Sequence, residues 1–106
     1  MVPYAKLVSA ALNEEIATKI AQQFAALSDP SRVRILASLL EGERRVSAIV
    51  DMVNLSQPVV SHHLSLLRQL RLVRTRKEGA QVFYCLHDDH IRDLLQRSLD
   101  HVQHED

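Results

Sequence analysis

The chain has 106 residues, of which 46% are hydrophobic and 25% charged, a composition typical of one small folded domain. No stretch approaches the length of a transmembrane span, and residues 1–8 lack the basic start and apolar run of a signal peptide. The only cysteine, Cys85, cannot form an internal disulfide. These features argue against a secreted or membrane-spanning protein, and they predict a cytoplasmic location with no membrane partner.

Thirteen basic and thirteen acidic residues give a net charge of zero, but the two signs are unevenly distributed. Residues 56–77 contain five basic residues and no acidic one. Residues 87–106 contain six acidic residues against two arginines. The first segment therefore suits a polyanion and the second suits a cation.

The N-terminal half is predicted to be helical. Residues 1–12 form an arm or a short leading helix, and one domain is expected to span residues 13–106. Asn13 is a plausible N-cap for the first helix of that domain, and Ser28-Asp29-Pro30 ends this helix and starts the next, which ends near Glu41-Gly42. The apolar positions at helical spacing are Ile16, Ile20, Phe24 and Leu27 in the first helix and Val33, Leu36, Leu39 and Leu40 in the second.

The second half contains two short helices, a hairpin and a last helix. Ser47 is a candidate cap for a helix that leaves through a left-handed Asn54, and the next helix begins at Ser56. Residues 72–77 and 81–86 alternate as strands, and the last helix is capped near His87-Asp88. The fold class is therefore mainly α with a small β-hairpin: a winged helix-turn-helix with four helices, a hairpin and a helix, expected as a homodimer.

The two short helices joined by Asn54-Leu55 have the layout of a helix-turn-helix, in which the second helix enters the major groove of double-stranded DNA. Its N-terminal residues would face base edges, and the basic first strand would contact phosphates. The predicted DNA-binding residues are Ser56, Gln57, Val59, Ser61, His62, His63, Arg68, Arg74, Arg76 and Lys77, and Val60 is assigned to the same surface.

Four potential metal ligands, Asp88, His90, His101 and His104, flank the last predicted helix. His90 and His101 lie eleven residues apart, which is roughly 16 Å along a helix at about 1.5 Å per residue. A zinc-type ion holds nitrogen ligands at about 2.0–2.1 Å, so one ion cannot reach both ends. Eleven residues are almost three turns, however, so both histidines face the same side. Two antiparallel helices in a dimer would therefore form two identical intersubunit sites.

Three imidazoles and one carboxylate fit Zn(II) or Co(II) in tetrahedral geometry, whereas Ni(II) would require additional ligands. His87 is interpreted as an exposed cap residue, with a supplementary ligand as the alternative. Cys85 is interpreted as a small apolar residue of the second strand. The predicted cofactor is thus a divalent ion, Zn(II) with Co(II) or Ni(II) as alternatives, acting as an allosteric effector.

The segments Ala26–Leu36 and Asn54–Leu64, together with the hairpin residues Lys77–Gly79 and Val82–Tyr84, resemble the ArsR/SmtB family of metal-responsive repressors. The resemblance implies a homodimer that binds operator DNA when metal-free and is released by metal. It also implies a dimer interface made by the first and last helices. Members that sense soft metals use a cysteine motif on the third helix, and residues 44–49 contain no cysteine, which argues against As(III), Cd(II) or Pb(II).

Two alternatives remain open at this stage. A winged-helix regulator could use zinc only as a structural ion or respond to a different inducer. A small zinc hydrolase could use the same four ligands, but a catalytic zinc usually keeps three protein ligands and an open position for water. Because no nucleophile elbow, phosphate loop or HExxH motif is present, the sequence predicts that the protein is not an enzyme.

Overall fold

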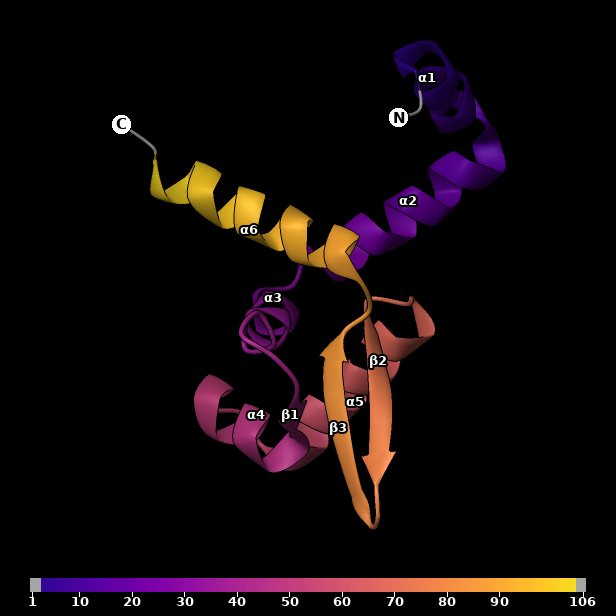
Figure 1. Cartoon of the computed structure of the whole chain (residues 1–106). Coiled ribbons are helices and arrows are strands. Elements are labelled where there is room, and N and C mark those ends of the chain that lie inside the picture. The colour runs from indigo at the N-terminus through magenta and orange to yellow at the C-terminus, as the bar shows by residue number, and fades with distance from the viewer. Residues whose placement is uncertain (1–2, 105–106) are drawn as a thin grey trace.

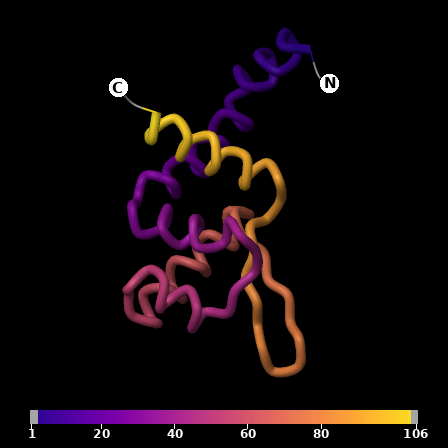
Figure 2. Tube along the Cα trace, turned by 60° about the vertical axis from the view of Figure 1, so that its left-hand side comes forward, coloured from indigo at the N-terminus to yellow at the C-terminus, as the bar shows by residue number. Residues whose placement is uncertain are grey.

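The computed structural model of the chain describes residues 3–104. In chain order the elements are α1 (Tyr4–Leu12), α2 (Glu14–Ala26), α3 (Pro30–Ala37), β1 (Arg44–Arg45), α4 (Val46–Val53), α5 (Gln57–Gln69), β2 (Val73–Glu78), β3 (Gln81–Leu86) and α6 (Asp89–Gln103). Figures 1 and 2 show a body of α3, α4, α5 and the sheet, with α1 and α2 rising away from one end and the hairpin tip projecting at the other. No helix among the described residues is both long and apolar enough to span a membrane.

The predicted winged helix-turn-helix is confirmed, with one additional strand. The sheet has the order β1-β3-β2, and both pairings are antiparallel. Phe83 in the central strand lies opposite Arg45 of β1 and Arg76 of β2. The sequence analysis missed β1 because its two arginines carry no apolar alternation, so this strand is defined only by its pairing with β3.

The core lies where α3, α4 and α5 pack against the sheet. Its fully buried side chains include Ile35, Leu36, Leu39, Ile49, Val60, Leu64, Leu67 and Leu72. The last helix contributes only its N-terminal half, because Ile91 and Leu95 are buried whereas Leu99 and Val102 are 47% and 60% exposed. The C-terminal half of α6 therefore extends beyond the core of the single chain (Figure 1).

Most predicted helix boundaries are confirmed by their caps. Asn13, Ser56 and Asp88 each accept a backbone N–H of the first turn, from Ile16, Val59 and Ile91 respectively. Two predictions were wrong. Ser47 is not the cap of α4, which begins at Val46 after Arg45 and has no side-chain cap bond. Helix α3 ends at Ala37, before the predicted Glu41-Gly42, although Leu39 in the following turn is still fully buried.

Two residues other than glycine adopt a left-handed backbone, and each ends a helix of the DNA-reading unit. Asn54, with φ of 57°, ends α4 as predicted. Arg71, with φ of 59°, follows α5, and the N–H of Leu72 donates to Leu67 O at 2.9 Å. This bond pattern is common at helix ends that use glycine, because a Cβ atom is disfavoured at positive φ.

We expect Arg71→Gly to raise the free energy of unfolding by about 0.5 kcal/mol, because relief of the left-handed strain exceeds the added entropy of the unfolded chain. Urea denaturation followed by circular dichroism measures the change. The control is Ser65→Gly at an exposed position inside α5, which should lower the stability by about 0.5 kcal/mol. An Arg71→Gly variant less stable than the parent would contradict the strain argument.

Candidate DNA- and metal-binding sites

The geometry of the helix-turn-helix is fixed by three local interactions. The backbone N–H of Asn54 donates to Val50 O at 2.9 Å and closes α4. The guanidinium of Arg34, from α3, donates to Val53 O and satisfies a second carbonyl at this helix end. The hydroxyl of Ser56 accepts from Val59 N at 3.4 Å and starts α5. The turn between the two helices is therefore held by backbone carbonyls and a cap rather than by apolar packing alone.

Helix α5 presents most of the predicted DNA-facing residues to solvent. The exposed members of the set on this helix and its cap are Ser56, Gln57, Val59, Ser61, His62 and Arg68. Val60 is fully buried and belongs to the core, which corrects its assignment to the DNA surface. His63 is only half-exposed, and its Nδ1 is buried without a hydrogen-bond partner among the described residues. The polar surface of α5 is thus narrower than the sequence suggested.

The three basic residues of β2 have different surroundings. The Nε of Arg74 donates to His87 O at 3.1 Å, which ties β2 to the segment that precedes α6. Arg76 lies between two carboxylates, Glu43 and Glu78. Lys77 is exposed and makes no ion pair within residues 3–104.

Helix α6 carries the four predicted metal ligands in two separate pairs. Asp88 is its N-cap and His104 its C-cap, and His90 and His101 lie within it. Because the helix is continuous, the two pairs are roughly 16 Å apart at about 1.5 Å per residue. Within residues 3–104, no three metal-binding side chains converge in one chain. The prediction that one protomer cannot assemble the site is confirmed.

The first pair, Asp88 and His90, divides the two carboxylate oxygens of Asp88 between two tasks. Oδ1 accepts the N–H of Ile91 at 3.1 Å, and Oδ2 lies 3.7 Å from His90 Nδ1. The hydrogen bond from Ile91 and the nearby imidazoles of His90 and His87 lower the pKa of Asp88 despite a small opposing effect of burial. The carboxylate therefore stays deprotonated at neutral pH, as a metal ligand must.

The second pair, His101 and His104, lies on one side of the last turn, three residues apart. The Nδ1 of His104 is 2.7 Å from Asp100 O. When Nδ1–H donates to this carbonyl, the lone pair of Nε2 points away from the helix and can bind a metal. His87, by contrast, is half-buried and its Nδ1 lacks a partner among the described residues, so it is not the exposed cap that the sequence suggested.

An apolar groove of about 290 Å³ runs beside the second pair. It is lined by Val33, Ala37, Leu40, Leu95, Ser98, Leu99 and Val102. The apolar stripe of α2 is also uncovered in the single chain, with Ile16, Ile20 and Phe24 at 40%, 39% and 57% exposure. Apolar surface of this extent usually marks an interface.

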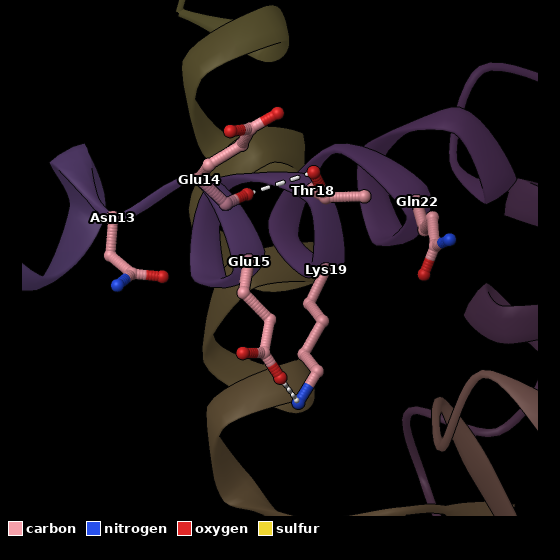
Figure 3. A pocket seen from close by; sticks show the side chains of 6 residues that line it. All are labelled: Asn13, Glu14, Glu15, Thr18, Lys19 and Gln22. Carbon is pink, nitrogen blue, oxygen red and sulfur yellow. Dashed lines mark hydrogen bonds and ion pairs between the residues drawn. The ribbon is translucent and has the colours of Figure 1, made fainter.

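A second hollow, on α2, has no comparable chemistry. Figure 3 shows its lining residues, Asn13, Glu14, Glu15, Thr18, Lys19 and Gln22, on the side of α2 opposite the apolar stripe. The charged groups of Glu15 and Lys19 are 3.5 Å apart, and the Thr18 hydroxyl donates to Glu14 O. These side chains bond within the helix rather than converge on a ligand.

Comparisons with known proteins agree with this arrangement. Residues 29–75 match the family described as bacterial regulatory protein, arsR family. The chain is 39% identical over 90 residues to the transcriptional repressor SmtB homolog of Synechocystis sp., covering 85% of this chain and 68% of that protein. It is 41% identical over 83 residues to the cadmium resistance transcriptional regulatory protein CadC homolog of Staphylococcus aureus, covering 77% and 69% respectively.

A solved structure gives the same result for the fold. The homodimeric winged helix-turn-helix DNA-binding domain of a Mycobacterium bovis protein matches with a TM-score of 0.80 and 25% identity, covering 90% of this chain and 89% of that chain. The relatives named here are transcriptional regulators, so the chain is a regulator and not an enzyme, as predicted. The chain belongs to the ArsR/SmtB family of transcriptional repressors.

Proposed function

We propose that the protein is a metal-responsive repressor that binds operator DNA as a homodimer and is released when Zn(II) binds between its subunits. Each of two equivalent sites would take Asp88 and His90 from one protomer and His101 and His104 from the other. The observation that carries this proposal is the placement of four exposed metal-type donors as two pairs at opposite ends of one continuous helix, α6.

The uncovered apolar surface supports a dimer in which α6 pairs with its symmetry mate. Leu99 and Val102 protrude next to the apolar groove, on the half of α6 that leaves the core. An antiparallel helix pair about a twofold axis would cover these side chains and place each N-terminal donor pair against the partner's C-terminal pair. The Mycobacterium bovis structure of the same fold is described as homodimeric, which supports the same assembly here.

The donor set fits a borderline divalent ion. A carboxylate kept deprotonated by its cap bond and three imidazoles form a four-coordinate set of the type that Zn(II) and Co(II) accept. The Staphylococcus aureus relative is named for cadmium resistance, but residues 44–49 of this chain contain no thiolate to favour a soft ion. We therefore assign Zn(II) as the effector, with Co(II) and Ni(II) as the ions to compare.

The DNA surface combines α5 with the wing. Gln57, Ser61 and His62 are exposed near the N-terminus of α5, where a recognition helix meets base edges, and Val59 is placed to meet a thymine methyl group. Arg68 and Lys77 are exposed cations at either side of this helix and suit phosphate contacts. Ser56 can donate its hydroxyl proton to a phosphate while its oxygen remains the helix cap.

The structure connects the metal-binding helix to the DNA-reading unit at two points. Arg92 of α6 donates to Leu40 O, in the turn after α3. His87, next to Asp88, donates its N–H to Leu72 O at 3.0 Å and accepts from Arg74 of the wing. A change in the position of α6 on metal binding would therefore shift the wing and alter the spacing of the two recognition helices, which opposes operator binding.

A zinc titration of the DNA-bound protein tests this function. A labelled duplex, selected by the metal-free protein from a random-sequence pool, should lose fluorescence anisotropy as Zn(II) is added, with an affinity decrease on the order of 5- to 150-fold. Metal-free protein should be folded and dimeric by circular dichroism and analytical ultracentrifugation, which would exclude a purely structural zinc. Tighter DNA binding in the presence of zinc would contradict the proposal.

A further inference from the structure

Arg76, in the wing strand β2, is held on both sides by carboxylates. Its Nε and Nη2 donate to Glu43 Oε2 and Oε1 at 3.1 and 2.6 Å, which makes a bidentate pair. Its Nη1 donates to Glu78 Oε2 at 3.0 Å. Every nitrogen of the guanidinium is therefore already engaged by a carboxylate of the same chain.

The pair with Glu43 spans the whole sheet. Glu43 directly precedes β1, and β3 lies between β1 and β2. Neighbouring strands are about 4.8 Å apart, so residues separated by a central strand are about 10 Å apart. The side chain of Arg76 covers this distance by crossing over Phe83, whose ring centroid is 4.8 Å from Arg76 Cζ. The contact thus ties the outer strand of the wing to the segment that enters α4 and the helix-turn-helix.

The alternation of side chains places Arg76 on the outer face of the sheet. Val73 and Leu86 are paired across β2 and β3, and both are buried against the helices. Lys77 shares their face because it lies four residues after Val73, whereas Arg76 lies on the opposite face. Lys77 is thus on the same face of the hairpin as α5, toward the tip, and Arg76 is turned the other way.

The electrostatics of the cluster favour the closed arrangement. The hydrogen bonds from Arg76 lower the pKa of Glu43, and the two carboxylates raise the pKa of Arg76. Isolated surface ion pairs contribute little to stability, but a bidentate pair that also stacks on an aromatic ring is geometrically restricted and more persistent. A DNA phosphate would have to compete with these carboxylates for the guanidinium.

We propose that Arg76 is a wing-positioning residue and not a phosphate ligand: with Glu43 and Glu78 it forms a clasp that sets the orientation of the hairpin for DNA binding. This inference rests on the proposed DNA-binding function and replaces the prediction that Arg76 contacts DNA. Lys77, on the helix side of the hairpin, provides the phosphate contact of the wing.

The variant Arg76→Lys separates the two roles because it keeps the charge and removes the bidentate geometry. A lysine would still serve as a phosphate ligand, so a phosphate role predicts a Kd for the selected duplex within about twofold of the parent. The clasp predicts a Kd at least about fivefold weaker, since a lysine cannot bind Glu43 through two parallel bonds. A Kd that is unchanged in this variant would overturn the proposal.

The variant Glu43→Gln gives opposite results for the two roles. If Arg76 were a phosphate ligand, the substitution would free it, tighten DNA binding and steepen the salt dependence by up to about 2 for two wings per dimer. The clasp predicts weaker binding and no steeper dependence than the matched control Glu41→Gln. That control removes the same charge two residues away, where the carboxylate is 87% exposed and only 3.7 Å from Arg44. Tighter binding than the control would overturn the proposal.

Hydrogen exchange of the hairpin amides in the DNA-free protein tests the clasp independently of DNA binding. Residues 73–86 should exchange faster in Arg76→Lys and Glu43→Gln, with no change in Glu41→Gln, and circular dichroism should confirm that all three variants are folded. Unchanged protection in both clasp variants would overturn the inference even if the parent binds DNA as proposed. A parent that fails to bind DNA would refute the proposed function and, with it, the assignment of the clasp to DNA binding.

Discussion

Replacing His101 with alanine is expected to leave DNA binding intact and to abolish release by zinc. His101 is an exposed residue of α6, remote from α5 and the wing tip, so the metal-free protein should bind the selected duplex with an unchanged Kd. Without this imidazole, each proposed site has three ligands, and the clamp between the subunits loses one of its two donors from the C-terminal end. The ratio of Kd values with and without Zn(II) should fall to about 1 from the 5- to 150-fold range of an allosteric coupling.

Gln103→Ala is the matched control, because Gln103 is exposed on the same turn of α6 and is not a proposed ligand. It should retain both DNA binding and release by zinc. Anisotropy titrations of the two variants, each in EDTA and in buffered Zn(II), provide the comparison. A His101→Ala protein that is still released at the same zinc concentration as the parent would remove α6 from the mechanism.

The contrast between α6 and the wing shows which parts of such a site can be predicted from sequence. Helical periodicity and the caps are local properties, so the N-caps Asn13, Ser56 and Asp88 and the left-handed Asn54 could all be predicted. The separation of the two donor pairs on α6 follows from helix geometry alone. The conclusion that one chain cannot complete the metal site therefore required no tertiary structure.

Features that depend on tertiary contacts could not be predicted in this way. The pair between Glu43 and Arg76 joins residues 33 positions apart, and β1, which brings them together, has no sequence pattern of its own. Arg76 in isolation resembles any other basic wing residue. Val60 likewise lies in a polar stretch, but the angle at which α5 packs on the core turns it inward. In both cases the direction of the side chain is decided by packing rather than by residue type.

Two complementary double variants are expected to restore one metal site when they are combined in a heterodimer. One protomer carries Asp88→Ala and His90→Ala, and the other carries His101→Ala and His104→Ala. Each homodimer then lacks half of the ligands in both proposed sites and should show no tetrahedral Co(II) absorption. In the heterodimer one site loses all four ligands, and the other keeps all four, because its donors come from the two unmodified halves. The heterodimer should therefore bind one Co(II) with about half the absorbance of the parent dimer.

This result depends only on how the donors are divided between chains, so it distinguishes an intersubunit site from any site within one protomer. The heterodimer is isolated by tandem affinity purification from cells that express both chains with different tags, and each homodimer from the same preparation serves as a control. Because Asp88 caps α6, its replacement costs about 1 kcal/mol of helix stability, and circular dichroism must show that the first double variant is folded. A heterodimer without Co(II) absorption, formed from two folded chains, would show that opposite ends of α6 do not meet across the dimer.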